Sequence, residues 1–138
     1  MSCATSKAEN VRALLDTHVL LWWLIDSERL SERARELMEA SDTDLFWSAA
    51  SSWEVAIKVG LGRLVLPEPA RSLIPRALQD QTIRPIDITQ AHALAVADLP
   101  PHHRDPFDRL LVAQATLDKL TVITADPVFE KYGARVAW

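Results

Sequence analysis

The sequence contains a single cysteine, Cys3, and only three glycines in 138 residues. One cysteine excludes an intrachain disulfide framework and fits a reducing compartment, so we expect a cytoplasmic protein. The longest uninterrupted apolar run, residues 19–25, is too short to span a membrane. Residues 1–10, MSCATSKAEN, lack the apolar segment of a signal peptide and are predicted to form a polar lead-in.

An excess of positive charge is also missing. The chain has 15 Lys and Arg against 19 Asp and Glu, which gives a formal net charge of −4. This balance argues against a large basic surface for nucleic acid, although not against a local basic patch. The sequence has no HExxH zinc spacing, no glycine-rich phosphate loop and no GxSxG turn. His102 and His103 lie in a proline-flanked loop, where they could contact a substrate.

The composition that remains is that of one soluble globular domain, predicted over residues 11–138 with 49% hydrophobic and 25% charged residues. Apolar runs predict strands, and amphipathic runs predict helices that alternate with them. The expected strands cover 11–15, 44–48, 82–88, 121–124 and 134–138, and the expected helices cover 18–25, 31–40, 51–62, 70–81, 89–99, 105–119 and 126–132. We expect Pro75 to start or break a helix and Pro85 to mark a sheet edge. This alternation predicts an α/β fold with a mostly parallel sheet.

Five acidic residues have informative positions on this map. Asp16 follows the first strand and Asp126 follows the strand at 121–124. Glu54 lies early in the helix after the second strand, while Asp105 and Asp108 open the helix at 105–119. Because ligands of open α/β sheets bind beyond the carboxyl ends of the strands, these acids are predicted to converge at one end of the sheet.

Each acid except Asp16 has a simpler interpretation. Three of them stand where helix caps or first-turn acids are favoured: Asp105, Asp108 and Asp126. Glu54 could pair with Lys58, four residues further along the helix. Asp16 stands between two nearly uncharged buried segments, where an ionised side chain needs a partner, a metal or a chemical role.

The occurrence of all five acids together favours a divalent cation. Capping does not require strand-end acids and early-helix acids to coincide on a parallel-sheet pattern. Mg²⁺ and Mn²⁺ prefer oxygen ligands, usually one or two carboxylates with waters and substrate phosphate. Such a site suits phosphodiester hydrolysis, in which the metal activates a water and neutralises developing charge.

Four segments in order resemble the PIN-domain ribonucleases, specifically VapC-like toxins of toxin–antitoxin pairs: LLDTHVLLWWL, SAASSWEVAIK, HRDPFDRLLVAQA and VITADPVFEKYGARVAW. The resemblance implies a three-layer α/β/α fold with a central, mostly parallel sheet of four to five strands. It also implies an Mg²⁺- or Mn²⁺-dependent endoribonuclease that cleaves RNA and inhibits growth. A cognate antitoxin, a homodimer and a toxin–antitoxin hetero-oligomer are the partners that it implies.

The resemblance carries roles onto individual residues. The four catalytic and metal-binding acids match Asp16, Glu54, Asp108 and Asp126. The supporting positions are Asp105, Thr17, Ser51 and Thr124, with Ser48 in the same small-polar pattern as Ser51. Asp16 and Asp108 are expected to be the principal ligands, with Asp126 direct or through water and Glu54 orienting the attacking water or binding a second ion.

Three cations next to these acids are candidates for RNA binding: Arg104, Arg109 and Lys58. Salt bridges to the same acids are the alternative. The pair Trp22–Trp23 is expected in the core or a dimer interface, because its helix is apolar throughout. Two other functions stay open: a receiver-like phosphoryl-accepting Mg²⁺ domain, and a catalytically silent PIN-like binding module. The usual receiver signature, an acidic pair after the first strand and a lysine after the last strand, is absent.

Overall fold

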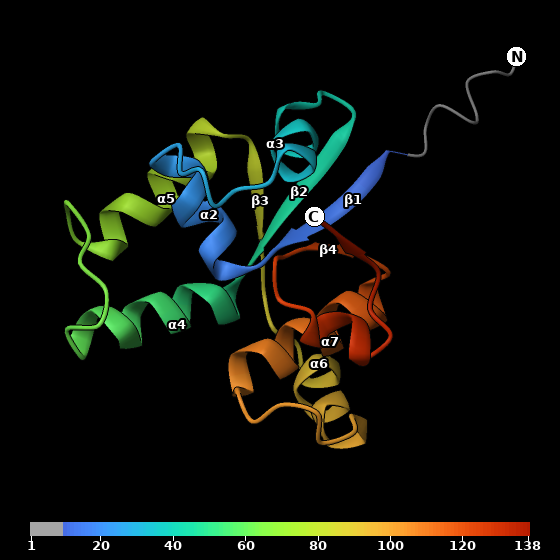
Figure 1. Cartoon of the computed structure of the whole chain (residues 1–138). Helices are drawn as coiled ribbons and strands as arrows, with labels where there is room; N and C mark the ends of the chain where they lie inside the picture. The colour runs from blue at the N-terminus through green and yellow to red at the C-terminus, as the bar shows by residue number, and fades with distance from the viewer. Residues whose placement is uncertain (1–9) are drawn as a thin grey trace, which may run out of the picture.

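A computed structural model describes residues 10–138, so residues 1–9 of the predicted lead-in lie outside the described chain. Five strands form one parallel sheet (Figure 1). The strands are β1 (Val11–Leu15), β2 (Thr43–Ser48), β3 (Ile83–Ile86), β4 (Thr121–Ile123) and β5 (Val136–Ala137). The predicted parallel α/β sheet is confirmed, and the last strand is shorter than expected.

The strand order is β3-β2-β1-β4-β5, with β1 at the centre of the sheet. The chain builds outward from β1 through β2 to β3, and then returns to the other side of β1 for β4 and β5. The order therefore reverses between β1 and β4. In open α/β sheets the crevice at such a reversal, beyond the carboxyl ends of the strands, is the usual ligand site. β3 is an edge strand, as Pro85 predicts.

The helices cover both faces of the sheet. They are α2 (Thr17–Leu24), α3 (Glu32–Glu39), α4 (Ala49–Gly60), α5 (Ala70–Asp80), α6 (Gln90–Ala95), α7 (Pro106–Asp118) and α8 (Val128–Lys131), with a 3₁₀ turn η1 (Val96–Asp98). Helices α6 and α7 lie across the sheet from α3 and α5 (Figure 1). Among residues 10–138, no helix is both long and apolar enough to cross a bilayer.

Two hydrophobic cores show why the fold has three layers. Successive strand residues point to opposite faces, so Leu15 and Trp47 join the core with α2, α3 and α5. Leu14 and Phe46 join the core with α7 and α8 instead. Strands buried on both faces read as continuous apolar runs, as this sequence does. The three-layer α/β/α prediction is confirmed.

Local signals were correct at several helix ends and wrong at Pro75. Ser31 caps α3 and Thr89 caps α6, each through its side-chain oxygen. Pro75, however, lies inside a continuous α5 and neither starts nor breaks it. A proline in a helix interior costs about 3 kcal/mol, but burial of Ile74 and Leu78 on the same helix offsets a loss of that size. The predicted helix at 89–99 is divided into α6 and the turn η1.

Candidate active site

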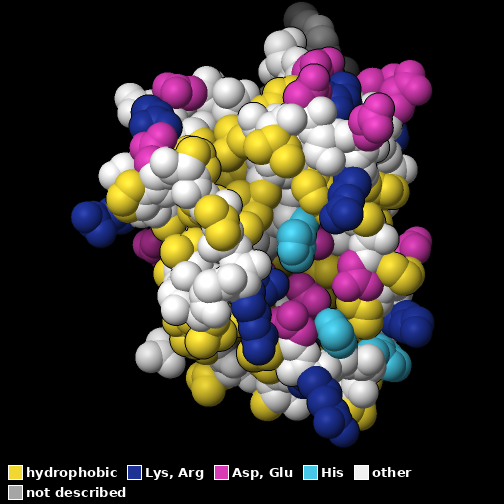
Figure 2. Space-filling view, turned by 60° about the vertical axis from the view of Figure 1, so that its left-hand side comes forward, with side chains coloured by type: hydrophobic (Ala, Val, Ile, Leu, Met, Phe, Trp, Pro, Cys, Tyr) yellow, Lys and Arg dark blue, Asp and Glu magenta, His cyan; other side chains and the backbone are white. Residues whose placement is uncertain are grey.

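The reversal between β1 and β4 opens into a cleft of about 350 Å³. All five acids line it, as the strand-end pattern predicts: Asp16, Glu54, Asp105, Asp108 and Asp126. Figure 2 shows acidic side chains gathered in a hollow of this face, with His and Lys or Arg side chains around them. The segments that carry these acids are far apart in sequence, and only the fold brings them together.

Asp16 and Asp126 are joined through one hydroxyl group. Asp16 Oδ1 accepts a hydrogen bond from the Thr17 backbone N–H at 2.7 Å, and Asp16 Oδ2 accepts one from Thr124 Oγ1 at 2.8 Å. Thr124 Oγ1 also accepts from the Asp126 N–H at 3.0 Å. Asp126 Oδ1 in turn accepts from the Val128 N–H at 3.0 Å, but the N-cap of α8 is Pro127 and not Asp126 as the sequence suggested. The hydroxyl therefore fixes the Asp16 carboxylate relative to the loop that carries Asp126.

Glu54 is held inside the cleft wall with only 3% of its surface exposed. Its Oε1 accepts a hydrogen bond from Thr17 Oγ1 at 2.6 Å, and its Oε2 pairs with Lys58 Nζ at 2.6 Å. Ser51 Oγ lies 2.9 Å from Thr17 Oγ1 and completes a buried polar chain. Both carboxylate oxygens are thus oriented by the protein, and the Glu54–Lys58 salt bridge considered from the sequence is present.

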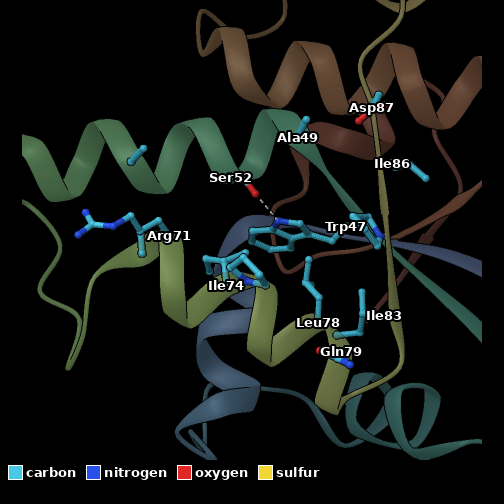
Figure 3. A pocket seen from close by; sticks show the side chains of 14 residues that line it. Trp47, Ala49, Ser52, Arg71, Ile74, Leu78, Gln79, Ile83, Ile86 and Asp87 are labelled. Atoms are coloured by element: carbon cyan, nitrogen blue, oxygen red, sulfur yellow. Dashed lines mark hydrogen bonds between the residues drawn. The ribbon is translucent and has the colours of Figure 1, made fainter.

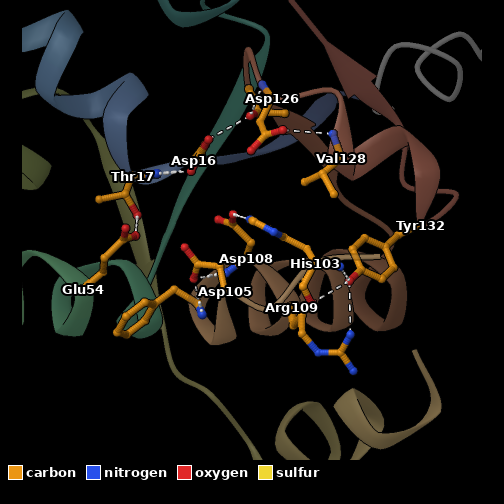
Figure 4. A network of polar contacts seen from close by, with 12 residues as sticks. Asp16, Thr17, Glu54, His103, Asp105, Asp108, Arg109, Asp126, Val128 and Tyr132 are labelled. Carbon is orange, nitrogen blue, oxygen red and sulfur yellow. Dashed lines mark hydrogen bonds and ion pairs between the residues drawn. The ribbon is translucent and has the colours of Figure 1, made fainter. Parts of the chain in front are cut away.

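The N-terminus of α7 brings Asp105, Asp108 and His103 together (Figure 4). Asp105 caps the helix, because its Oδ1 accepts from the N–H groups of Phe107 at 2.8 Å and Asp108 at 3.3 Å. The Asp108 side chain is 12% exposed, and its Oδ2 lies 3.1 Å from His103 Nε2. The position of Asp105 is therefore explained by helix capping. The Asp108 side chain makes neither of these capping bonds and points into the cleft.

The electrostatics of the cleft favour a cation. Burial raises the pKa of Asp108 to about 8, and the negative charges of the four other acids add to the shift. Burial also raises the pKa of Asp16, against the opposing effect of the Thr124 hydrogen bond. Two carboxyl groups with raised pKa values among other acids indicate negative charge that the protein leaves without full compensation. A donor set of carboxylate oxygens fits a hard divalent cation such as Mg²⁺ or Mn²⁺.

Arg109 lies in a different place from the one expected for an RNA-binding residue. Its guanidinium donates to backbone carbonyl oxygens of the preceding loop, those of Val96, Leu99 and Pro100, at 3.0 to 3.4 Å. It also donates to Tyr132 Oη at 3.1 Å. In Figure 4 it points away from the acids. The structure therefore places the Arg109 side chain against that loop. Lys58 lines the cleft, and Arg104 is exposed and lies in sequence between the cleft residues His103 and Asp105.

Two cleft residues were not selected from the sequence. His18 and Trp22 line the cleft, and their rings lie 5.9 Å apart on the first turns of α2. Their positions in the sequence indicate proximity to the cleft, because His18 follows Asp16 by two residues and Trp22 lies one turn further along the same helix. The apolar character of this helix favoured the core or a dimer interface, and Trp22 and Trp23 are partly buried and pack against the core.

A larger cavity of about 580 Å³ lies between α4, α5 and β3 (Figure 3). Apolar side chains such as Ile74, Leu78 and Ile83 form most of its lining. Trp47 forms part of its wall and donates from Nε1 to Ser52 Oγ at 2.7 Å. Its lining contains a single acid, Asp87, so the smaller cleft is the one with the chemistry of a cation site.

The fold and the cleft define a class of protein, a parallel α/β domain with a carboxylate-lined site at its strand reversal. Residues 13–135 match the PIN domain family. The chain is also 32% identical over 114 residues to Ribonuclease VapC22 of Mycobacterium tuberculosis, which covers 82% of this chain and 85% of that protein. The chain therefore belongs to the PIN domain family, and the resemblance drawn from its motifs is confirmed.

Solved structures show the same fold. VapBC2 from Rickettsia felis, crystallised with a DNA fragment from its promoter, aligns with a TM-score of 0.68 at 14% identity over 91% of this chain and 97% of that one. A toxin–antitoxin complex from Klebsiella pneumoniae aligns with a TM-score of 0.56 at 23% identity over 83% and 87% of the two chains. At these identities the likeness extends to the arrangement of strands and helices.

Proposed function

We propose that the protein is a metal-dependent endoribonuclease that acts as the toxin of a toxin–antitoxin pair. The observation that carries the proposal is the convergence of five acids in one cleft, with the pKa of Asp108 raised to about 8. The 32% identical relative is named a ribonuclease, and the chain covers 85% of it. The proposed substrate is intracellular RNA, and the proposed place of action is therefore the cytoplasm.

The residues proposed to hold the cation are Asp16 and Asp108, with Asp126 direct or through water. When bound, Mg²⁺ or Mn²⁺ lowers the pKa of a water molecule and neutralises charge at the scissile phosphate. The protein's own contribution is orientation, since Thr124 holds Asp16 through a hydrogen bond of 2.8 Å. Thr17 holds Glu54 in the same way at 2.6 Å, which suits Glu54 for orienting the attacking water.

Lys58 and Arg104 are proposed to contact the RNA backbone. The Lys58 side chain is 34% exposed while its Nζ pairs with Glu54, so it can reach a phosphate at the rim of the cleft. Arg104 is exposed in the loop that precedes α7. Contacts of this kind position a nucleic acid without reading its sequence.

A homodimer and a cognate antitoxin are proposed as partners. Exposed apolar side chains at two sites, Ile25 after α2 and Leu94 on α6, are 74% and 70% accessible and would be covered by a second chain. The antitoxin is proposed to lie across a groove near the acids, with a basic side chain that reaches them. The structural relative from Klebsiella pneumoniae is itself part of a toxin–antitoxin complex.

Neither alternative function has comparable support. A receiver-like phosphoryl-accepting domain is disfavoured by membership of the PIN domain family. A catalytically silent module is disfavoured because all four acids of the family pattern line one cleft: Asp16, Glu54, Asp108 and Asp126.

Cleavage of a panel of structured RNAs by the purified full-length chain tests the proposal. We expect cleavage with Mg²⁺ or Mn²⁺, none with EDTA, and none from Asp16→Asn under the same conditions. Asp42→Asn, an exposed acid outside the cleft, is the matched control and should cut at the wild-type rate. Equal cleavage by the wild type and Asp16→Asn, or cleavage that persists in EDTA, would refute the proposal.

A further inference from the structure

We propose that His103, Asp105 and Asp108 form a binding site for a transition metal ion of the Zn²⁺ type. This site shares Asp108 with the proposed Mg²⁺ or Mn²⁺ site, so the two ions compete. The competition between the two ions rests on the proposed nuclease function, whereas the binding of Zn²⁺ does not depend on that function.

The positions of the ligand atoms suit a single ion. One atom from each of the three side chains lies within 4.8 Å of the other two, and His103 Nε2 is 3.1 Å from Asp108 Oδ2. Ligands bound to zinc at about 2.0 to 2.2 Å are separated from one another by roughly 3 to 4 Å. Small rotations of these side chains are therefore sufficient to place all three around an ion.

The backbone around the three side chains is already fixed. The His103 N–H donates to Tyr132 Oη at 2.9 Å, and Arg109 donates to the same hydroxyl at 3.1 Å. Asp105 is fixed from the other direction as the cap of α7. Figure 4 shows the His103 side chain directed toward Asp108 from this anchored loop. The ion therefore meets a site whose loop needs little ordering, which favours binding.

The chemistry of the ligand set separates this site from the catalytic one. Carboxylates alone suit Mg²⁺ and Mn²⁺, whereas an imidazole nitrogen suits Zn²⁺ and later transition metals. The His103 side chain is 37% exposed, so an ion can reach its Nε2 from solvent. Because Asp108 belongs to both ligand sets, occupation by Zn²⁺ withdraws a ligand from the catalytic cation. Micromolar Zn²⁺ is therefore expected to inhibit Mg²⁺-dependent cleavage, and excess Mg²⁺ to relieve the inhibition.

Calorimetric titration of the full-length chain with ZnCl₂ tests the site without using activity. We expect His103→Asn to weaken Zn²⁺ binding at least about tenfold, since losses of 10- to 100-fold follow even from changes to groups that support a ligand. His102→Asn is the matched control, because His102 is its neighbour in the same loop and packs against Tyr132 with ring centroids 5.0 Å apart. This control should keep its Zn²⁺ affinity within about twofold of the wild type, as expected for a residue outside the ligand set.

A parallel titration with MnCl₂ separates the two metal sites. We expect His103→Asn to retain Mn²⁺ binding, and Asp108→Asn to lose both ions. Unchanged Zn²⁺ affinity in His103→Asn, or a loss that appears in His18→Gln instead, overturns the site. If Zn²⁺ binding depends on His103 but no RNA is cut with Mg²⁺ or Mn²⁺, the nuclease proposal fails and the binding site stands. If RNA is cut but the Zn²⁺ affinity of His103→Asn is unchanged, the Zn²⁺ site is refuted and the nuclease proposal stands.

Discussion

Replacement of Asp108 by asparagine should stabilise the metal-free protein while it removes activity. Burial of the Asp108 carboxyl, and after it the negative charges of the four other acids, raise its pKa from 3.8 to about 8. At pH 7 the folded state therefore retains a proton that the unfolded state has released. The folded state binds more protons between about pH 4 and pH 8, so its stability falls as the pH rises through that window. Asparagine titrates in neither state and removes this penalty.

The magnitude follows from the separation between the unfolded pKa and the working pH. At about 1.4 kcal/mol per pH unit, the interval from the unfolded pKa of 3.8 to pH 7 costs the wild type about 4 kcal/mol, and the interval to pH 5 costs roughly 1 to 2 kcal/mol. In a domain of this size each kcal/mol moves the melting temperature by about 3 °C. Asp108→Asn should therefore melt about 12 °C above the wild type at pH 7 and about 5 °C above it at pH 5.

Thermal melts followed by circular dichroism in EDTA check this expectation, with Asp42→Asn as the exposed control that should melt with the wild type. Addition of Mn²⁺ should raise the melting temperature of the wild type and have little effect on Asp108→Asn, because a bound ion stabilises only a fold that binds it. RNA cleavage should be severely reduced in the variant. An Asp108→Asn protein that melts below the wild type at pH 7 in EDTA would refute the electrostatic reasoning.

Three further predictions concern neighbouring residues. Asp16→Asn should remain folded, with a melting temperature at or above that of the wild type, while cleavage and growth inhibition are lost; loss of the fold with normal specific activity would instead make Asp16 structural. Asp105→Ser should keep the α7 cap and most activity, whereas Asp105→Ala should cost about 1 kcal/mol in urea denaturation. A stable but inactive Asp105→Ser would reverse the roles given to Asp105 and Asp108. Arg109→Ala should lower the free energy of unfolding by about 2 kcal/mol, whereas Arg104→Ala should leave it unchanged and weaken RNA binding.

The sequence predicted the structure best at positions where the residue type strongly favours one local conformation. The bounds of β1 are Val11–Leu15 as predicted, and Ser31 and Asp105 cap the helices that follow them. The convergence of the acids was also predictable, because parallel strands bring their carboxyl ends to one edge. The alternation of strands and helices therefore predicts that Asp16 and Asp126, which each follow a strand, lie at the same edge of the sheet.

The direction of the Arg109 side chain on α7 could not be predicted. Arg109 stands next to Asp108, so proximity in sequence suggested the cleft, yet its guanidinium binds carbonyl groups of a loop that folds back along α7. Nothing local to Arg109 encodes that loop path. Pro75 shows the same limit in another form, since burial of its helix decides the outcome against the intrinsic preference of proline. Tertiary contacts thus override local signals at both positions.

The hydrogen bond between Thr124 and Asp16 closes a loop across 108 residues, and β4 lies beside β1 through the same long connection. A contact of this sequence separation forms late in folding, because the entropy of closing the intervening chain must be overcome first. A chain that is still being synthesised, and has not yet added β4, lacks the partner that orients Asp16. Such an unfinished chain carries the first four acids without the arrangement that makes them a site. Phosphodiester cleavage would therefore begin only when β4 has been added and the whole domain is complete.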